Sequence, residues 1–133
     1  MPNLTHFAYT IVYVADVAAS LDFYERAFGL ERKFLHESGA YGELNTGSTA
    51  LAFVSHEVAL ESVGRDYVSA GTSAAPLGME IGLACADVPA AFERAVKAGA
   101  QPLKDPVSKP WGQVVAYVRC PDGSLVELCT PMS

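Results

Sequence analysis

The 133-residue sequence has few charged residues, and basic residues are the scarcer kind. Only 18% of its residues are charged, with 9 lysines and arginines against 15 aspartates and glutamates, so the net charge is −6. Half of the residues are hydrophobic, which is enough for a folded core. The shortage of basic residues argues against binding to nucleic acid or to anionic membrane surfaces, because both need basic patches.

Long apolar runs and paired cysteines are also missing. No run approaches the roughly 20 apolar residues of a membrane-spanning helix. Residues 1–6 lack the basic start and apolar stretch of a signal peptide. The three cysteines, Cys85, Cys120 and Cys129, are odd in number and form no Cys-x-x-Cys pair, which favours reduced thiols. Together these features predict a cytoplasmic protein that does not span a membrane.

The hydrophobic pattern of the first half predicts a strand, a helix and three further strands. β-branched and aromatic residues fill positions 6–14, and Asp16 and Gly29 fit the start and end of a helix over residues 17–28. Strands are expected at 31–37, 40–46 and 49–55, followed by a short helix at 56–64. Residues 65–77 are rich in Gly, Ser, Ala and Pro and are interpreted as a linker.

The same order of elements recurs in the second half. Ala15-Asp16-Val17 matches Ala86-Asp87-Val88 at a distance of 71 positions, and Gly29 matches Gly99 at 70. We therefore expect an N-terminal module (residues 1–64), the linker (65–77) and a C-terminal module (78–133) that share one domain. Each module has the order βαβββ. With the helices on the outer face, two such modules would leave a concave cleft that suits a ligand.

The second module ends in a hairpin around Pro121-Asp122-Gly123. Proline presets φ, aspartate bonds the backbone of its own turn, and glycine supplies a positive φ. The returning strand, Leu125 to Leu128, carries a carboxylate, Glu127, among apolar neighbours. Such a side chain must face either solvent or a site.

As a set, these motifs resemble the vicinal oxygen chelate superfamily of glyoxalases, bleomycin resistance proteins and extradiol dioxygenases. The carrying stretches are Val14-Ala15-Asp16, Leu21 to Tyr24, Phe28 to Leu30, Asp87 to Gly99, Trp111-Gly112 and Pro121 to Leu128. The resemblance implies an α+β fold of two βαβββ modules, whose strands form a U-shaped mixed sheet around the cleft. It also implies a homodimer, in which a second subunit could complete the cleft.

In members that use a metal, the ligands lie on the first and last strands of each module. The resemblance places the corresponding positions at Tyr9, Glu80 and Glu127, with Leu51 as the fourth through the internal repeat. Only Glu80 and Glu127 are of ligand type, so we expect no tightly bound cofactor. A hard divalent cation on Glu127, Glu80 and Tyr9 is the alternative, because oxygen ligands suit Mg²⁺, Ca²⁺ or Mn²⁺.

The resemblance and the alternation of strand residues assign the remaining candidates. Tyr9 and Tyr13 would share the cleft face of the first strand, and Cys129 would share that of Glu127. Phe53 would lie on the same face as Leu51, and Trp111 near the cleft mouth, where it could stack on a planar ligand. The alternatives are a structural Cys129, a core or subunit-contact Trp111, and carboxylates that accept hydrogen bonds from tyrosines or water.

Three functions follow from these expectations. The first is binding or sequestration of an organic small molecule: Glu80 and Glu127 would anchor a cationic or hydrogen-bonding group, and aromatic residues would cover its apolar part. The second is a metal-dependent lyase or isomerase that resembles lactoylglutathione lyase. The third is a metal-free enzyme with Glu127 or Glu80 as a general base. The sequence does not decide whether the protein is an enzyme, and it does not identify a ligand.

Overall fold

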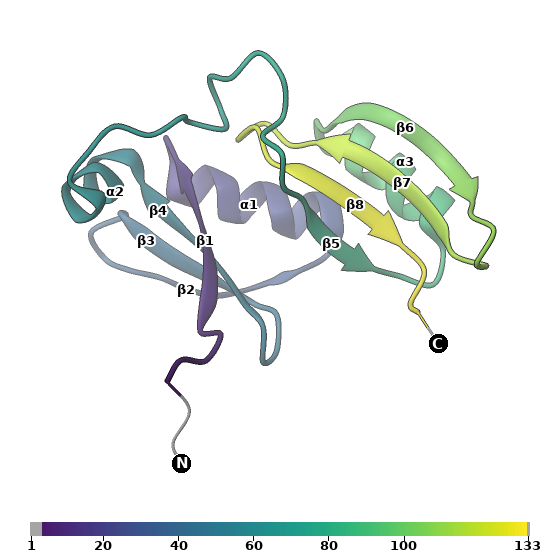
Figure 1. Ribbon diagram of the computed structural model, residues 1–133, viewed down its shortest axis with the longest axis horizontal. Helices are drawn as coiled ribbons and strands as arrows, with labels where there is room; N and C mark the ends of the chain where they lie inside the picture. Colours follow the sequence, from purple (N-terminus) through teal and green to yellow (C-terminus); the bar gives the residue numbers. More distant parts are fainter. Residues whose placement is uncertain (1–3, 133) are drawn as a thin grey trace.

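Each half of the chain forms a four-stranded sheet with one long helix on one face in the computed structural model, which describes residues 4–132 (Figure 1). The first half contains β1 (Tyr9–Val14), α1 (Val17–Phe28), β2 (Glu31–Leu35), β3 (Tyr41–Asn45), β4 (Ala50–Ser55) and α2 (His56–Val63). The second half contains β5 (Ile81–Ala84), α3 (Val88–Ala98), β6 (Gln101–Ser108), β7 (Val114–Arg119) and β8 (Leu125–Cys129). The expected α+β fold of two βαβββ modules is confirmed. The prediction that residues 1–6 form no signal peptide includes residues 1–3, which lie outside the described residues.

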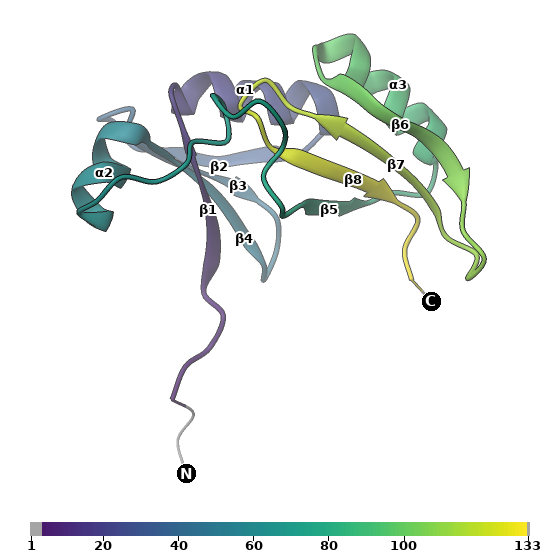
Figure 2. The same ribbon diagram turned by 45° about the horizontal axis from the view of Figure 1, so that its top comes forward.

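Within the described residues, each strand pairs only with strands of its own module. They form two open sheets with the orders β1-β4-β3-β2 and β5-β8-β7-β6. The pairs β1–β4 and β5–β8 are parallel, and the others are antiparallel. Figure 2 shows α1 and α3 together on one side, with the two sheets arching away beneath them. We call the sheet surfaces turned away from the helices the concave face.

The helices begin and end where the capping residues predict. Asp16 Oδ1 accepts a hydrogen bond from the Ala19 backbone N–H at 3.0 Å, and Asp87 does the same for Ala90 at 3.1 Å. Gly29 ends α1 in the left-handed conformation with φ at 71°. Several strands are shorter than expected; β1, for example, begins at Tyr9 rather than at residue 6. Within residues 4–132, no helix has the length and apolar character that crossing a membrane requires.

One hydrophobic core extends across both modules. Tyr24 and Leu21 of α1 are fully buried, as are Phe53 of β4 and Val126 of β8. The Tyr24 ring lies 5.0 Å from that of Phe53, and its hydroxyl donates to Asp122 Oδ2 in the β7–β8 turn at 3.3 Å. The α1 helix therefore contacts both its own sheet and the hairpin of the other module.

The linker is fastened to the β7–β8 hairpin by Arg119. Its Nη2 donates to the backbone oxygens of Ala70 and Ser73, each at 2.9 Å, and its Nε donates to the Gly123 oxygen at 3.3 Å. At the same place the linker backbone passes directly over Gly123, which has φ at 92°. A Cβ atom at Gly123 would lie 2.0 Å from the Ala70 oxygen, so only glycine fits.

We expect Gly123→Ala to destabilise the protein by more than about 3 kcal/mol, because it adds a backbone clash to a strained φ. Gly47→Ala is the matched control: its φ is 75°, but nothing lies within 4 Å of the added atom. The control should cost only about 1–2 kcal/mol. Urea unfolding of both variants measures the difference, and equal losses would contradict this account of the linker contact.

Candidate functional site

The first strand places its tyrosines on the concave face. In β1, Val12 and Val14 pack against the core on the helix side, so the alternating residues Tyr9, Ile11 and Tyr13 point the other way. Tyr9 is 57% exposed. Tyr13 is half-buried, and its ring lies 5.0 Å from that of Tyr67 in the linker. Tyr9 and Tyr13 therefore share one face of β1, the face turned away from the helices.

The expected positions of Leu51 and Phe53 are wrong. Both residues are buried in the core on the helix side of β4, and Phe53 packs against Tyr24 of α1. The strand register pairs Ile11 with Ala52 in the first sheet and Gly82 with Glu127 in the second, so Ala52 is the counterpart of Glu127. The internal repeat was aligned one residue off across the hairpins, and a one-residue slip moves every side chain of a strand to the opposite face.

Glu127 lies on the concave face of the second sheet, opposite Tyr117. The buried residues Val126 and Leu128 face the core, which leaves Glu127 on the other side of β8. The Tyr117 hydroxyl donates to Glu127 Oε2 at 3.0 Å. Partial desolvation, followed by the hydrogen bond to this carboxylate and its charge, raises the pKa of Tyr117 to about 12. Tyr117 is therefore a hydrogen-bond donor at neutral pH.

Glu80 joins this group from the segment just before β5. Although the residue is exposed, desolvation raises the pKa of its carboxyl, and Glu127 raises it further through like charge and a hydrogen bond. Gly82 lies directly beside this group, since a Cβ there would be in van der Waals contact with Glu127 Oε1 at 3.8 Å. We call Glu80 and Glu127 the carboxyl pair. The structure brings these two predicted residues together.

Cys129 and Trp111 have different surroundings. Cys129 follows Glu127 on the same face of β8 and is half-buried. Desolvation, then the charge of Glu127, raises the pKa of its thiol, so it stays protonated and is a poor nucleophile at neutral pH. Trp111 lies in the β6–β7 turn, is 64% exposed, and donates its Nε1–H to Gln113 Oε1 at 2.9 Å. It lines none of the cavities described below.

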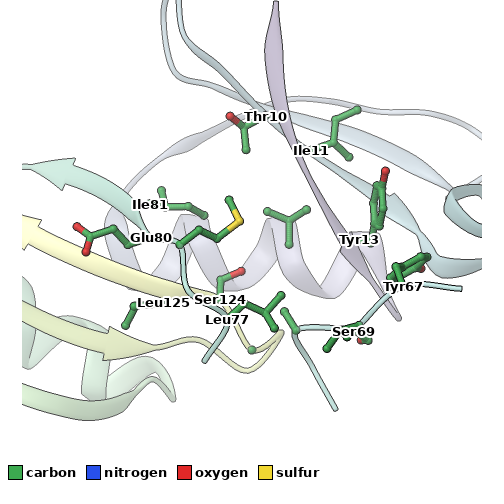
Figure 3. A pocket seen from close by; sticks show the side chains of 15 residues that line it. Thr10, Ile11, Tyr13, Tyr67, Ser69, Leu77, Glu80, Ile81, Ser124 and Leu125 are labelled. Atoms are coloured by element: carbon green, nitrogen blue, oxygen red, sulfur yellow. The ribbon is translucent and has the colours of Figure 1, made fainter. Parts of the chain in front are cut away.

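A cavity of about 190 Å³ lies where the modules meet beneath the linker, and we call it the junction cavity (Figure 3). Its walls come from β1, the segment before β5, the linker and the start of β8. Tyr13 and Tyr67 stand at one end, and Glu80 stands at the other with its carboxyl group directed away from the cavity. Its lining residues are mostly apolar or aromatic, and Thr10, Ser69 and Ser124 are among its few polar ones.

A larger cavity of about 730 Å³ lies on the other side of the Glu80 segment, lined by residues of β1, β4, β5 and α3 and by the end of α1. Thr10, Met79, Glu80 and Ile81 line both cavities. Glu80 therefore stands at a boundary between two spaces.

The sequence analysis missed Tyr117, Tyr67 and Ser69. Tyr117 has a usable signal: counting outward from the Pro-Asp-Gly turn places it opposite Glu127, as the observed register does. Tyr67 and Ser69 have no such signal, because they belong to an irregular segment whose path depends on the side chains that hold it. His56 Nδ1 lies 2.6 Å from the Tyr67 hydroxyl and therefore helps to fix the position of this ring.

The donor set does not fit the metal centre that the resemblance implies. The four corresponding positions hold Tyr9, Ala52, Glu80 and Glu127, which provide only two carboxylates and an exposed phenol. Among residues 4–132 no three His, Cys, Asp or Glu side chains come together in a way that could hold a metal ion. Catalytic metal sites usually need three protein ligands. We therefore assign no step of the function to a metal.

Comparison with known proteins identifies the family. The model of the Glyoxalase/Bleomycin resistance protein/Dioxygenase superfamily matches residues 4–128, and the chain belongs to this superfamily. A glyoxalase-related enzyme from Fulvimarina pelagi is similar in structure, with a TM-score of 0.81 and 26% identity over 96% of this chain and 89% of the other. A family enzyme from Burkholderia phytofirmans PsJN has a TM-score of 0.80 and 19% identity over 96% and 100%.

A third similar structure is TioX from Micromonospora sp. ML1, with a TM-score of 0.68 and 21% identity over 96% of this chain and 100% of that one. The two likenesses below 25% identity show a common fold. Comparison with curated protein sequences gave no significant match. The comparisons therefore define the superfamily and leave the ligand to be argued from the site.

The raised pKa of Glu80 predicts a pH-dependent effect of Glu80→Gln. A carboxyl whose pKa is higher in the folded state stabilises the fold below its unfolded pKa, and this contribution is lost as the pH rises through the folded value. Near neutral pH, Glu80→Gln should therefore be more stable than the parent, by less than about 1 kcal/mol because the site is solvent-screened.

Urea unfolding near neutral pH and at about pH 3 measures this difference, which should disappear at the lower pH, where Glu80 is protonated. Glu93→Gln on α3 is the control, because it removes the same charge from an exposed site with no carboxyl pair. A Glu80→Gln variant less stable than the parent near neutral pH would contradict the repulsion from Glu127.

Proposed function

We propose that this protein binds a small organic cation on the concave face, with the carboxyl pair as its anchor. The observation that carries the proposal is the clustering of Glu80, Glu127 and Tyr117 in one open part of the second sheet. No basic residue contributes to the pKa shift of Glu80. The two carboxyl groups therefore make this part of the surface attractive to a positive charge.

The electrostatics of the pair favour a cation over a neutral ligand. With no ligand bound, Glu127 repels a negative charge on Glu80 and raises the pKa of Glu80. A bound ammonium or guanidinium group would reverse this effect, since an opposite charge favours the ionised carboxylate. Binding should therefore release a proton from Glu80 and should strengthen as the pH rises through the pKa of that residue.

The supporting groups suit binding by association alone. Tyr117 fixes the Glu127 carboxylate through a hydrogen bond, and Tyr9 and Tyr13 supply aromatic surface on the facing sheet. Aromatic faces attract cations and cover apolar parts of a ligand. Sequestration of a cationic compound would need no further chemistry. The homodimer and the cytoplasmic location stay predictions.

A metal-free enzyme is the second candidate, and the raised pKa of Glu80 is the observation that favours it. A carboxyl group with a raised pKa beside a second carboxyl group can provide an acid and a base in one site. Such an enzyme would show catalytic turnover that is lost in both the Glu80→Gln and the Glu127→Gln variant. No observation of this kind supports the metal-dependent lyase or isomerase that resembles lactoylglutathione lyase, because the side chains at the corresponding positions do not fit a metal centre.

A thermal-shift comparison of matched compounds tests the binding proposal. Benzylamine and benzamidine should raise the melting temperature near neutral pH, and benzyl alcohol, which is uncharged, should not. Glu127→Gln should weaken binding of the cations by about tenfold or more, since one charged hydrogen-bonding partner is lost. Glu93→Gln again serves as the control for the overall loss of charge.

Two outcomes would overturn the proposal. Equal stabilisation by benzyl alcohol would show that charge is not recognised. Equal cation affinity in the parent and Glu127→Gln proteins would show that the carboxyl pair is not the anchor.

A further inference from the structure

We infer that the junction cavity is the binding site for the aromatic ring of the ligand, so the ligand class is an arylalkylamine. This inference rests on the proposed function, because the carboxyl pair supplies the site for the amine. It adds a second binding site, formed largely by the linker and the hairpin that the linker crosses.

The cavity has the size and chemistry for a ring. Its volume of about 190 Å³ exceeds the roughly 150 Å³ of an apolar cavity known to admit benzene. Ile11, Leu77, Ile81 and Leu125 provide apolar walls, and the Tyr13–Tyr67 pair provides aromatic surface at one end. A planar hydrocarbon group can contact these rings in the tilted or stacked arrangements that aromatic pairs prefer.

The cavity is held open by contacts that do not involve a ligand. Arg119 fastens the linker through the Ala70 and Ser73 oxygens, and His56 holds Tyr67 at 2.6 Å. The Gly123 backbone lies directly against the same linker segment at Ala70. Because the wall is already fixed, little ordering entropy is lost when a ring enters, which favours binding.

The position of Glu80 sets the shape of the ligand. Its backbone and stem line the end of the junction cavity opposite Tyr67, while its carboxyl group is directed out toward the concave face (Figure 3). A ring inside the cavity and an ammonium group at the carboxyl pair must therefore be joined by a short chain that passes Glu80. The molecule that meets both conditions is an amine on a short alkyl chain that ends in one aromatic ring.

The test compares 2-phenylethylamine, n-propylamine and 2-phenylethanol by calorimetric titration of the whole protein near neutral pH. Burial of the ring should make 2-phenylethylamine bind at least about tenfold more tightly than n-propylamine. Ile11→Trp, which fills the cavity from β1, should abolish this difference while n-propylamine binds as before. Ile11→Val is the control and should retain most of the difference.

A second variant guards against a misfolded tryptophan mutant. Tyr67→Leu removes the aromatic wall and the contact with His56, and it should lower the affinity for 2-phenylethylamine several-fold without changing that for n-propylamine. Line broadening or shifts of the Tyr67 and Tyr13 ring signals on addition of 2-phenylethylamine would locate the ring directly.

The outcomes separate the two proposals. If both amines bind equally well and Ile11→Trp changes neither, the ring does not enter the junction cavity, and the proposed cation site stands alone. If neither amine binds, or if Glu127→Gln leaves both affinities unchanged, the proposed function itself fails. Tight binding of 2-phenylethanol that Ile11→Trp abolishes would show a ring site that does not depend on the amine.

Discussion

The packing of α1 against α3 is the contact on which the rest of the molecule depends. The two sheets share no strand pairing, so the helices carry most of the connection between the modules. Arg94 of α3 donates to the Arg26 oxygen at 2.9 Å, and Arg26 donates to the Ala98 oxygen at 3.3 Å. These reciprocal bonds fix the relative position of the helices. The distance between the facing edges of β1 and β5, and with it the junction cavity, follows from that position.

The carboxyl pair illustrates how a superfamily fold acquires a chemistry of its own. The scaffold fixes a face on each inner strand, and the side chains at those positions decide what the face can bind. Here Ala52 and Tyr9 occupy positions where the resemblance implies metal ligands, while Glu80 and Glu127 keep acidic groups. The result is an anionic, partly aromatic surface, which carries the proposed recognition of a cation.

Most of the fold could be predicted because local signals and tertiary structure agree. Asp16, Asp87 and Gly29 act as caps in the structure, and the internal repeat indicated both modules. The faces of β4 could not be predicted in the same way. The two hairpins differ in length, and strand faces alternate with each residue, so an alignment error of one position sent Leu51 and Phe53 to the wrong side.

The candidate site was predicted in part for a related reason. Glu127 stood out as a carboxylate in an apolar strand, the family resemblance indicated Glu80, and the structure brings the two together. The positions of the linker residues Tyr67 and Ser69 could not be predicted, because Arg119 and His56 determine where that segment runs. The sequence does not indicate such distant partners. Trp111 stood out in the sequence as the single tryptophan, yet it lies in an exposed turn away from both cavities.

The central claim is that Glu80 and Glu127 form one coupled site, and a carbon-13 NMR titration of the glutamate carboxyl groups tests it most directly. The account predicts that the Glu80 signal titrates with a pKa above the ordinary glutamate range and that Glu127→Gln moves this pKa down toward that range. An ordinary pKa for Glu80 in the parent protein, or a pKa that Glu127→Gln leaves unchanged, would contradict the claim.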